Sequence, residues 1–69
     1  MSLPEALEHL RAGRPRDAAG FLESHLKEAP QDAAGWRMLG ACRHAQGDFK
    51  GAATAFATSI RLQAHDLQA

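Results

Sequence analysis

Apolar side chains recur every three to four residues along most of this chain, which is the period of an amphipathic α-helix. Helix-breaking and helix-capping residues divide that pattern at regular intervals. The segments between them predict helices over about 3–12, 15–29, 32–46 and 49–63, and a fifth helix whose start alone is present. The breakers and caps are Gly13 with Pro15, Pro30 with Asp32, Gly47 with Asp48, and His65 with Asp66.

Local signals support these helix ends. Ser2 and Glu5 have the spacing of a capping box, and Pro15 suits the first turn of the second helix. The short carboxylate of Asp32 is expected to cap the third helix, and Asp66 is expected to open the fifth. The predicted buried stripe of the fourth helix consists of Phe49, Ala52, Ala53, Phe56, Ile60 and Leu62.

A shift of 34 residues superimposes the two halves of the chain. Gly13 then falls on Gly47 and Asp32 on Asp66, while the pair Ala18 and Ala19 falls on the pair 52–53. The identities lie at turns, at caps and at the smallest packing positions. This distribution is typical of stacked helical hairpins, because glycine ends one helix and alanine lets the next helix approach closely.

Composition narrows the choice of fold and of partner. The chain has 69 residues, 15 of them alanine, and it has no Val or Tyr, so helix is favoured over strand and the core must be thin. Eight basic and eight acidic side chains cancel, which argues against a general nucleic-acid or membrane binder. A single cysteine and the lack of a long apolar run predict a soluble, cytoplasmic protein.

The second half of the chain carries a specific pattern: Trp-x-x-Leu-Gly at 36–40, Gly-Asp-Phe at 47–49 and Ala-x-x-x-Phe at 52–56. This pattern resembles the tetratricopeptide repeat. The resemblance implies an all-α, right-handed superhelical stack of two helical hairpins plus a truncated fifth helix. We expect one domain over 1–69, with repeats at about 1–31 and 32–65 and the start of a third at 66–69. The residues expected to hold the repeats together are Trp36, Leu39, Gly40, Ala52 and Phe56.

The resemblance also implies a non-catalytic binding module, whose first helices line a concave groove for a peptide or a helix. We expect this groove to be lined by Leu7, Leu10, Arg37, Met38, Ala41 and His44. In an alternative interpretation, the leucines of the first helix turn inward and pack against Phe21 and Leu22. Some family members hold a partner's C-terminal carboxylate in the groove, but Ala34, Met38 and Ala41 do not support that activity here.

Two function classes remain open. The chain is interpreted as a scaffold or adaptor that binds another protein, or as an oligomerisation segment of a larger, catalytic protein. An uncovered fourth helix predicts homo-oligomers. The end at Ala69, just inside the next repeat, suggests a piece of a longer array or of a larger protein. The phrase Leu-Gly-Ala-Cys-Arg-His resembles the N-terminal repeat regions of larger bacterial proteins, some with transferase domains.

Other candidate chemistry has a structural explanation. Arg11, Arg14, Arg16 and Lys50 predict either a basic ridge for acidic peptide or phosphate, or a solvated rim balanced by nearby aspartates. Four histidines and Cys42 show no metal-ligand pair at i, i+4 spacing, and Cys42 is expected to be a buried, inert packing residue. We therefore predict no metal, no cofactor and no catalytic residue.

Overall fold

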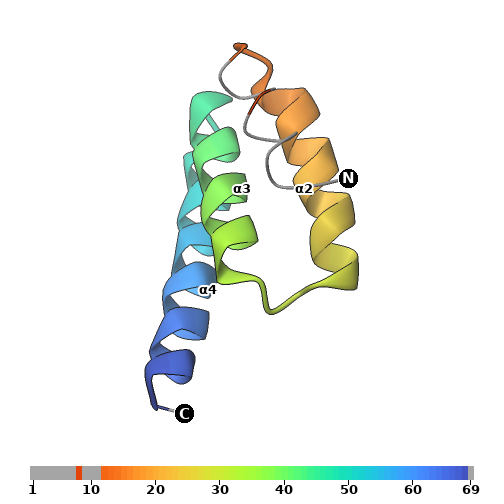
Figure 1. Ribbon diagram of the computed structural model, residues 1–69. Helices are drawn as coiled ribbons and strands as arrows, with labels where there is room; N and C mark the ends of the chain where they lie inside the picture. Colours follow the sequence, from red (N-terminus) through yellow and green to blue (C-terminus); the bar gives the residue numbers. More distant parts are fainter. Residues whose placement is uncertain (1–7, 9–11, 69) are drawn as a thin grey trace.

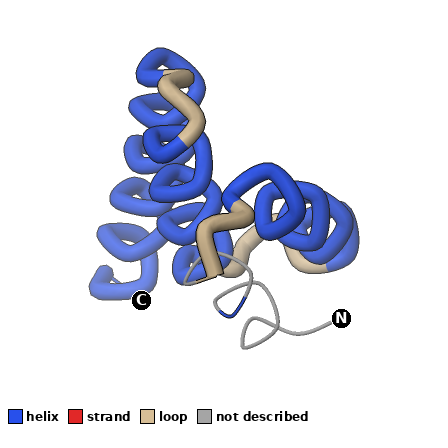
Figure 2. Tube along the Cα trace, turned by 90° about the horizontal axis from the view of Figure 1, so that it is seen from above, coloured by secondary structure: helices blue, strands red, loops and turns tan. Residues whose placement is uncertain are grey.

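Three α-helices make up the part of the chain that the structure describes. This computed structural model describes residue 8 and residues 12–68, with side chains up to residue 64. The helices are α2 (Pro15–Glu28), α3 (Ala33–Ala45) and α4 (Phe49–Gln68), and the described residues include no β-strand. Helix α3 packs against both α2 and α4 (Figure 1). Figure 2 shows α2 to one side of the α3–α4 pair. The predicted all-α stack is confirmed.

Helix α2 begins and ends where its prolines predict. Pro15 occupies the first turn, where its missing N–H costs no hydrogen bond. After Glu28 the amide of Ala29 still donates to the carbonyl oxygen of His25 over 2.9 Å, and Pro30 prevents the helix from continuing. The helix predicted over 3–12 falls largely outside the described residues.

Helix α3 is closed at both ends by local hydrogen bonds. Asp32 is its N-cap, and the Asp32 side chain accepts from the amide of Gly35 over 3.3 Å. At the other end Gly47 has a φ of +83°, a backbone conformation that glycine adopts without strain. The amides of Gly47 and Asp48 donate to the carbonyl oxygens of His44 and Arg43, both over 2.9 Å. This is a Schellman C-cap, so the chain reverses tightly into α4.

Helix α4 starts as predicted but ends later. The Asp48 carboxylate accepts from the amide of Gly51 over 3.0 Å and so caps the helix. The helix then runs without a break to Gln68. The predictions that it ends near Gln63 and that Asp66 opens a fifth helix are therefore wrong for this part of the chain. The physical reason is that no Gly or Pro lies between Gly51 and Gln68, and Ala64, a strong helix former, stands where a terminating proline would be needed.

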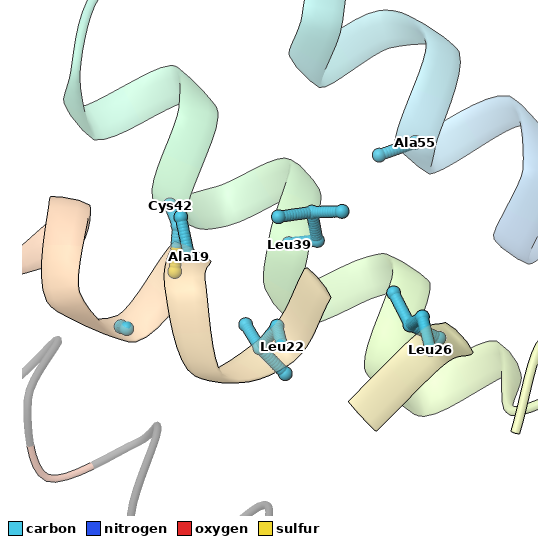
Figure 3. Close-up of a cluster of buried hydrophobic side chains, with 7 residues drawn as sticks. Ala19, Leu22, Leu26, Leu39, Cys42 and Ala55 are labelled. Atoms are coloured by element: carbon cyan, nitrogen blue, oxygen red, sulfur yellow. The ribbon is translucent and has the colours of Figure 1, made fainter. Parts of the chain in front are cut away.

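The core lies where α3 meets the other two helices. Figure 3 shows side chains from all three helices meeting in this core. Leu22, Leu39 and Cys42 are the largest fully buried side chains. At about 1.5–3 kcal/mol for each fully buried large apolar side chain, so few of them give a modest driving force for folding. The cluster consists of Ala18, Ala19, Leu22, Leu26, Leu39, Cys42 and Ala55.

The face that α4 turns inward differs in part from the predicted stripe. Ala52 is buried and Phe56 is half-buried, as predicted, but Phe49 and Ile60 are 63% and 65% exposed. Ala53, also predicted to be buried, is exposed. Ala55 and Ser59 are buried instead. The Ser59 hydroxyl donates to the carbonyl oxygen of Ala33 over 2.8 Å, so α4 approaches α3 through small side chains and one buried hydrogen bond.

Candidate functional site

The residues predicted to line the groove of the second repeat share one side of α3. Arg37 and His44 are exposed, and Met38 and Ala41 are half-buried. Their spacing spans two turns of the helix and places them on the side away from both of the hollows described below. Met38 also packs against the buried cluster, so its side chain serves the core as well as the surface.

The remaining predicted groove residues are not tested by the structure. Leu7 and Leu10 lie outside the described residues.

His44 is joined to the start of α4, because its ring meets that of Phe49 edge to face, with centroids 5.1 Å apart and planes at 65°. Of the predicted groove residues, those on α3 extend along the helix as far as this aromatic pair.

Two adjacent hollows lie on the opposite side of α3. The larger, of about 500 Å³, lies where all three helices meet, and the smaller, of about 170 Å³, lies between α2 and α3. Glu23 and Arg43 line both of them, and none of the predicted groove residues that the structure describes lines either. The larger is lined by Arg16, Ala19, Glu23, Arg43, Gln46, Asp48, Gly51 and Thr54, and the smaller by Glu23, Leu26, Lys27, Trp36, Leu39 and Arg43.

Charges in the larger hollow cancel. Arg16 and Arg43 stand against Glu23 and Asp48. Arg43 donates from Nη1 to the carbonyl oxygen of Gly51 over 3.2 Å, so it ties the end of α3 to the start of α4. With two cations and two anions, this hollow offers little selectivity for a charged ligand.

The predicted basic ridge is only partly described. Arg14, Arg16 and Lys50 are exposed, and Arg11 lies outside the described residues. Arg16 shares the larger hollow with acidic side chains. This arrangement favours the interpretation of a solvated, balanced rim over a phosphate site.

The predicted repeat-packing residues lie at the contacts between helices. Gly40 is buried against the ring of Phe56, since a Cβ at position 40 would lie 2.8 Å from two carbons of that ring. Trp36 is half-buried, and its indole Nε1 donates to the carbonyl oxygen of Pro30 over 2.8 Å, which joins α3 to the loop after α2. Leu39 and Ala52 are 1% and 3% exposed.

A second link joins α2 to α3. His25 Nε2 lies 2.7 Å from Oδ2 of Asp32, and because a carboxylate only accepts, the imidazole nitrogen donates. This hydrogen bond, together with the amide of Gly35, lowers the pKa of Asp32 despite its partial burial. Asp32 therefore does two things at once: it caps α3 and it holds the last turn of α2.

Reactive chemistry is not favoured in the described part of the chain. Cys42 is a buried free thiol, and burial raises its pKa, which keeps the sulfur protonated and weakly nucleophilic. Among the side chains that the structure describes, at residue 8 and residues 12–64, no three His, Cys, Asp or Glu are placed to hold a metal ion. No helix among these residues is both long enough and apolar enough to span a bilayer.

The sequence signal for the hollows was indirect. The shift of 34 residues places Arg16, which lines the larger hollow, on Lys50. This equivalence does not show which side of α3 is left open by the neighbouring helices. That depends on how three helices meet, which the sequence pattern does not specify.

Comparison with known proteins agrees with this geometry. A family described as tetratricopeptide repeat matches residues 3–66. The search of curated proteins gave no match, and neither did the search of solved structures. The family match spans nearly all of the 69 residues, and the described helices form the α-hairpin packing that the repeat requires; the chain belongs to the tetratricopeptide repeat family.

Proposed function

We propose that this chain is a non-catalytic protein–protein interaction module that binds a peptide or helix of a partner along α3. Tetratricopeptide repeats generally mediate protein–protein interactions, and the family is typically non-catalytic. One observation carries the proposal: Arg37, Met38, Ala41 and His44 lie on a single side of α3, with the two polar side chains exposed.

The proposed groove would extend from α3 onto the first helix through Leu7 and Leu10, in a unit of two repeats at about 1–31 and 32–65. An apolar strip with a guanidinium and an imidazole at its edge suits an amphipathic peptide that carries a carboxylate. In this role the chain is a cytoplasmic scaffold or adaptor with a protein partner, without nucleic acid or membrane.

The test starts from peptides selected on the intact chain from a phage-displayed random library. Their affinity is then measured by calorimetry against the Arg37→Glu/His44→Glu variant. Both side chains are exposed, so we expect the fold to be retained although the contact between the rings of His44 and Phe49 is lost, whereas Met38→Glu would also disturb the core. We expect the affinity to fall at least about tenfold, because carboxylates introduced on both side chains would repel an acidic ligand.

Arg14→Glu is the matched control, since it reverses an exposed charge at the residue just before α2. It should leave the affinity unchanged. Peptides that bind the double variant as tightly as the parent would move the site away from α3. Peptides that lose affinity with the control as well would show that only long-range charge is being measured.

A second candidate function is the assembly of copies of this chain, or of a larger protein that contains it. Phe49 and Ile60, large apolar residues exposed on α4, favour it. Sedimentation velocity from 5 to about 500 µM tests this candidate. A sedimentation coefficient that rises with concentration and falls back in Ile60→Glu supports assembly, and a monomer throughout rejects it.

A further inference from the structure

The internal repeat shows how an uncovered helix of this chain becomes covered. Helices α2 and α4 are equivalent under the shift of 34 residues. On α2, the side chains Ala19, Leu22 and Leu26 are only 6%, 1% and 5% exposed, because α3 packs over them. A Cβ at Gly35 of α3 would lie 3.0 Å from Cδ2 of Leu26, which shows how closely the two helices approach.

Two of the three equivalent positions of α4 are open, and the third, Phe56 in place of Leu22, is half-buried against Gly40. Ala53 corresponds to Ala19 and is exposed, and Ile60 corresponds to Leu26 and is 65% exposed. Phe49 and Ala57 extend the same side of the helix and are exposed as well. We call these four residues the open face of α4. In the repeat it corresponds to part of the surface that accepts α3, and in the described part of the chain only the ring of His44 lies against it, at Phe49.

The edge of the open face differs in charge from the equivalent edge of α2. On α2, the cations Arg16 and Lys27 border the hollows, and Glu23 stands between them. On α4 the cations recur as Lys50 and Arg61, but Ala57 replaces the glutamate. No acidic side chain lies on α4 from Phe49 to Ala64. The edge of the open face is therefore cationic, and the capping Asp48 next to it lines the larger hollow on the other side of α4.

This difference specifies the occupant. At the edge of α2, Arg43 of α3 lines both hollows together with Glu23, so opposite charges share that space. Suppose that a partner helix is seated on α4 as α3 is seated on α2. The partner residue equivalent to Arg43 would then lie beside Lys50, Ala57 and Arg61. A cation there meets only like charge, whereas a carboxylate meets two cations.

We propose that the open face of α4 is a docking site for an amphipathic helix of a partner protein, seated as α3 is seated on α2, with an acidic residue at the position that Arg43 occupies in α3. The proposal goes beyond the groove on α3, because it uses a different helix and different residues. Each can fail without the other.

A second copy of this chain fits the open face less well. A two-fold pair presents the same face from both sides, and it would therefore bring the cationic edges of the two α4 helices into one interface. From Phe49 to Ala64, where the side chains of α4 are described, no acidic side chain is present to compensate. Charge thus favours a different, acidic helix.

The probe is a 17-residue peptide of residues 31–47, with Cys42→Ala to prevent oxidation and a lactam bridge joining positions 37 and 41 to preform the helix. These two positions lie away from both hollows. One form keeps Arg43 and the other carries Arg43→Glu. Both are titrated into the intact ¹⁵N-labelled chain and followed by NMR up to millimolar peptide.

We expect the Arg43→Glu peptide to bind at least about tenfold more tightly than the Arg43 peptide, since like-charge contacts are costly at interfaces. Amide shifts should be centred on Phe49, Ala53 and Ile60. The Ile60→Glu variant should lose the interaction. The Lys50→Glu/Arg61→Glu variant should reverse the preference between the two peptides, and Arg14→Glu should leave it unchanged.

Three results would overturn the proposal: equal affinity of the two peptides, no shifts on α4 at millimolar peptide, or shifts centred on Arg37 and Ala41. The last result would support the α3 groove and reject the α4 site. Sedimentation of the unliganded chain adds a further outcome. If the chain forms a dimer, if Ile60→Glu dissociates that dimer and if neither peptide displaces it, the open face is assigned to a second copy of the chain.

Discussion

At the scale of single residues, the surroundings of a side chain decide what a substitution does. Gly20 and Gly40 both lie inside helices, where glycine costs about 0.5–1 kcal/mol relative to alanine. A Cβ at Gly20 would meet nothing within 4 Å, whereas one at Gly40 would lie 2.8 Å from the ring of Phe56. The same residue type is therefore a weakness at one position and a requirement at the other.

Alanine at these two positions should have opposite effects. Gly20→Ala should raise the free energy of unfolding by about 0.5–1 kcal/mol, because it removes backbone entropy from the unfolded chain. Gly40→Ala should lower it by about 1–3 kcal/mol, since the methyl group displaces the Phe56 ring. Urea unfolding followed by circular dichroism measures both. Stabilisation by Gly40→Ala would mean that α3 and α4 are not in close contact at this point.

Asp32 makes stability depend on acid. Its pKa is lowered in the folded chain, mainly by the hydrogen bond from His25, so its carboxylate stabilises the fold above the unfolded pKa of about 3.9. That contribution is lost as the pH falls through the lower, folded pKa. Melting temperatures of the parent and of Asp32→Asn should therefore differ at pH 6 and converge below about pH 4.

His25→Ala provides the companion measurement. Without the imidazole, the Asp32 carboxyl should titrate closer to its ordinary pKa, as followed by the NMR shift of its side-chain carbon. An unchanged Asp32 titration in His25→Ala would show that the link between α2 and α3 is absent in solution.

At the scale of elements, α4 docks through small side chains and one directional bond. Ser59 is 3% exposed and donates to a carbonyl oxygen of α3, while the hydroxyl of exposed Thr54 donates within α4, to Lys50. Ser59→Ala should therefore cost about 1 kcal/mol of unfolding free energy. Thr54→Ala, which removes a hydrogen bond within α4 and raises helix propensity, should be neutral or slightly stabilising. Equal effects of the two would show that the Ser59 bond does not hold α4 in place.

The starts and stops of the elements could largely be predicted from the sequence. Pro15, Pro30 and Gly47 act through their own covalent geometry, so their effect is local and visible in the sequence. The end of α4 was mispredicted because Asp66 has the chemistry of an N-cap but no breaker precedes it. A cap residue does not end a helix that is already formed.

Which face of α4 turns inward was harder to predict. Helix α4 carries alanines on several of its sides, so a helical period of apolar residues fits more than one face. Contact with α3 selects the face of Ala52, Ala55 and Ser59 and leaves Phe49 and Ile60 open. The hollows beside Arg43 could not be predicted for the same reason, since they exist only once three helices are placed.

At the scale of the whole molecule, a thin core makes stability depend on few side chains. Leu39, in the central helix, is 1% exposed and belongs to the buried cluster. Leu39→Ala should cost about 2–5 kcal/mol, a large share of what so small a domain has, and leave much of the chain unfolded at 25 °C. Ile60→Ala removes similar apolar bulk from an exposed position and should change stability by less than about 0.5 kcal/mol. Thermal melts distinguish the two, and a large loss in Ile60→Ala alone would show that the open face of α4 is covered in solution.

Helix α3 packs at the same time on α2 and on α4, and the stacked repeat depends on both contacts. The most direct measurement is a nuclear Overhauser spectrum of the intact chain, read at the two glycines of α3 that approach its neighbours. We expect strong cross-peaks from the α-protons of Gly35 to a methyl group of Leu26 and from those of Gly40 to the ring of Phe56. Cross-peaks at Gly40 without those at Gly35 would show that α2 is detached from the α3–α4 hairpin. That result would contradict the stacked repeat, on which both proposed docking sites depend.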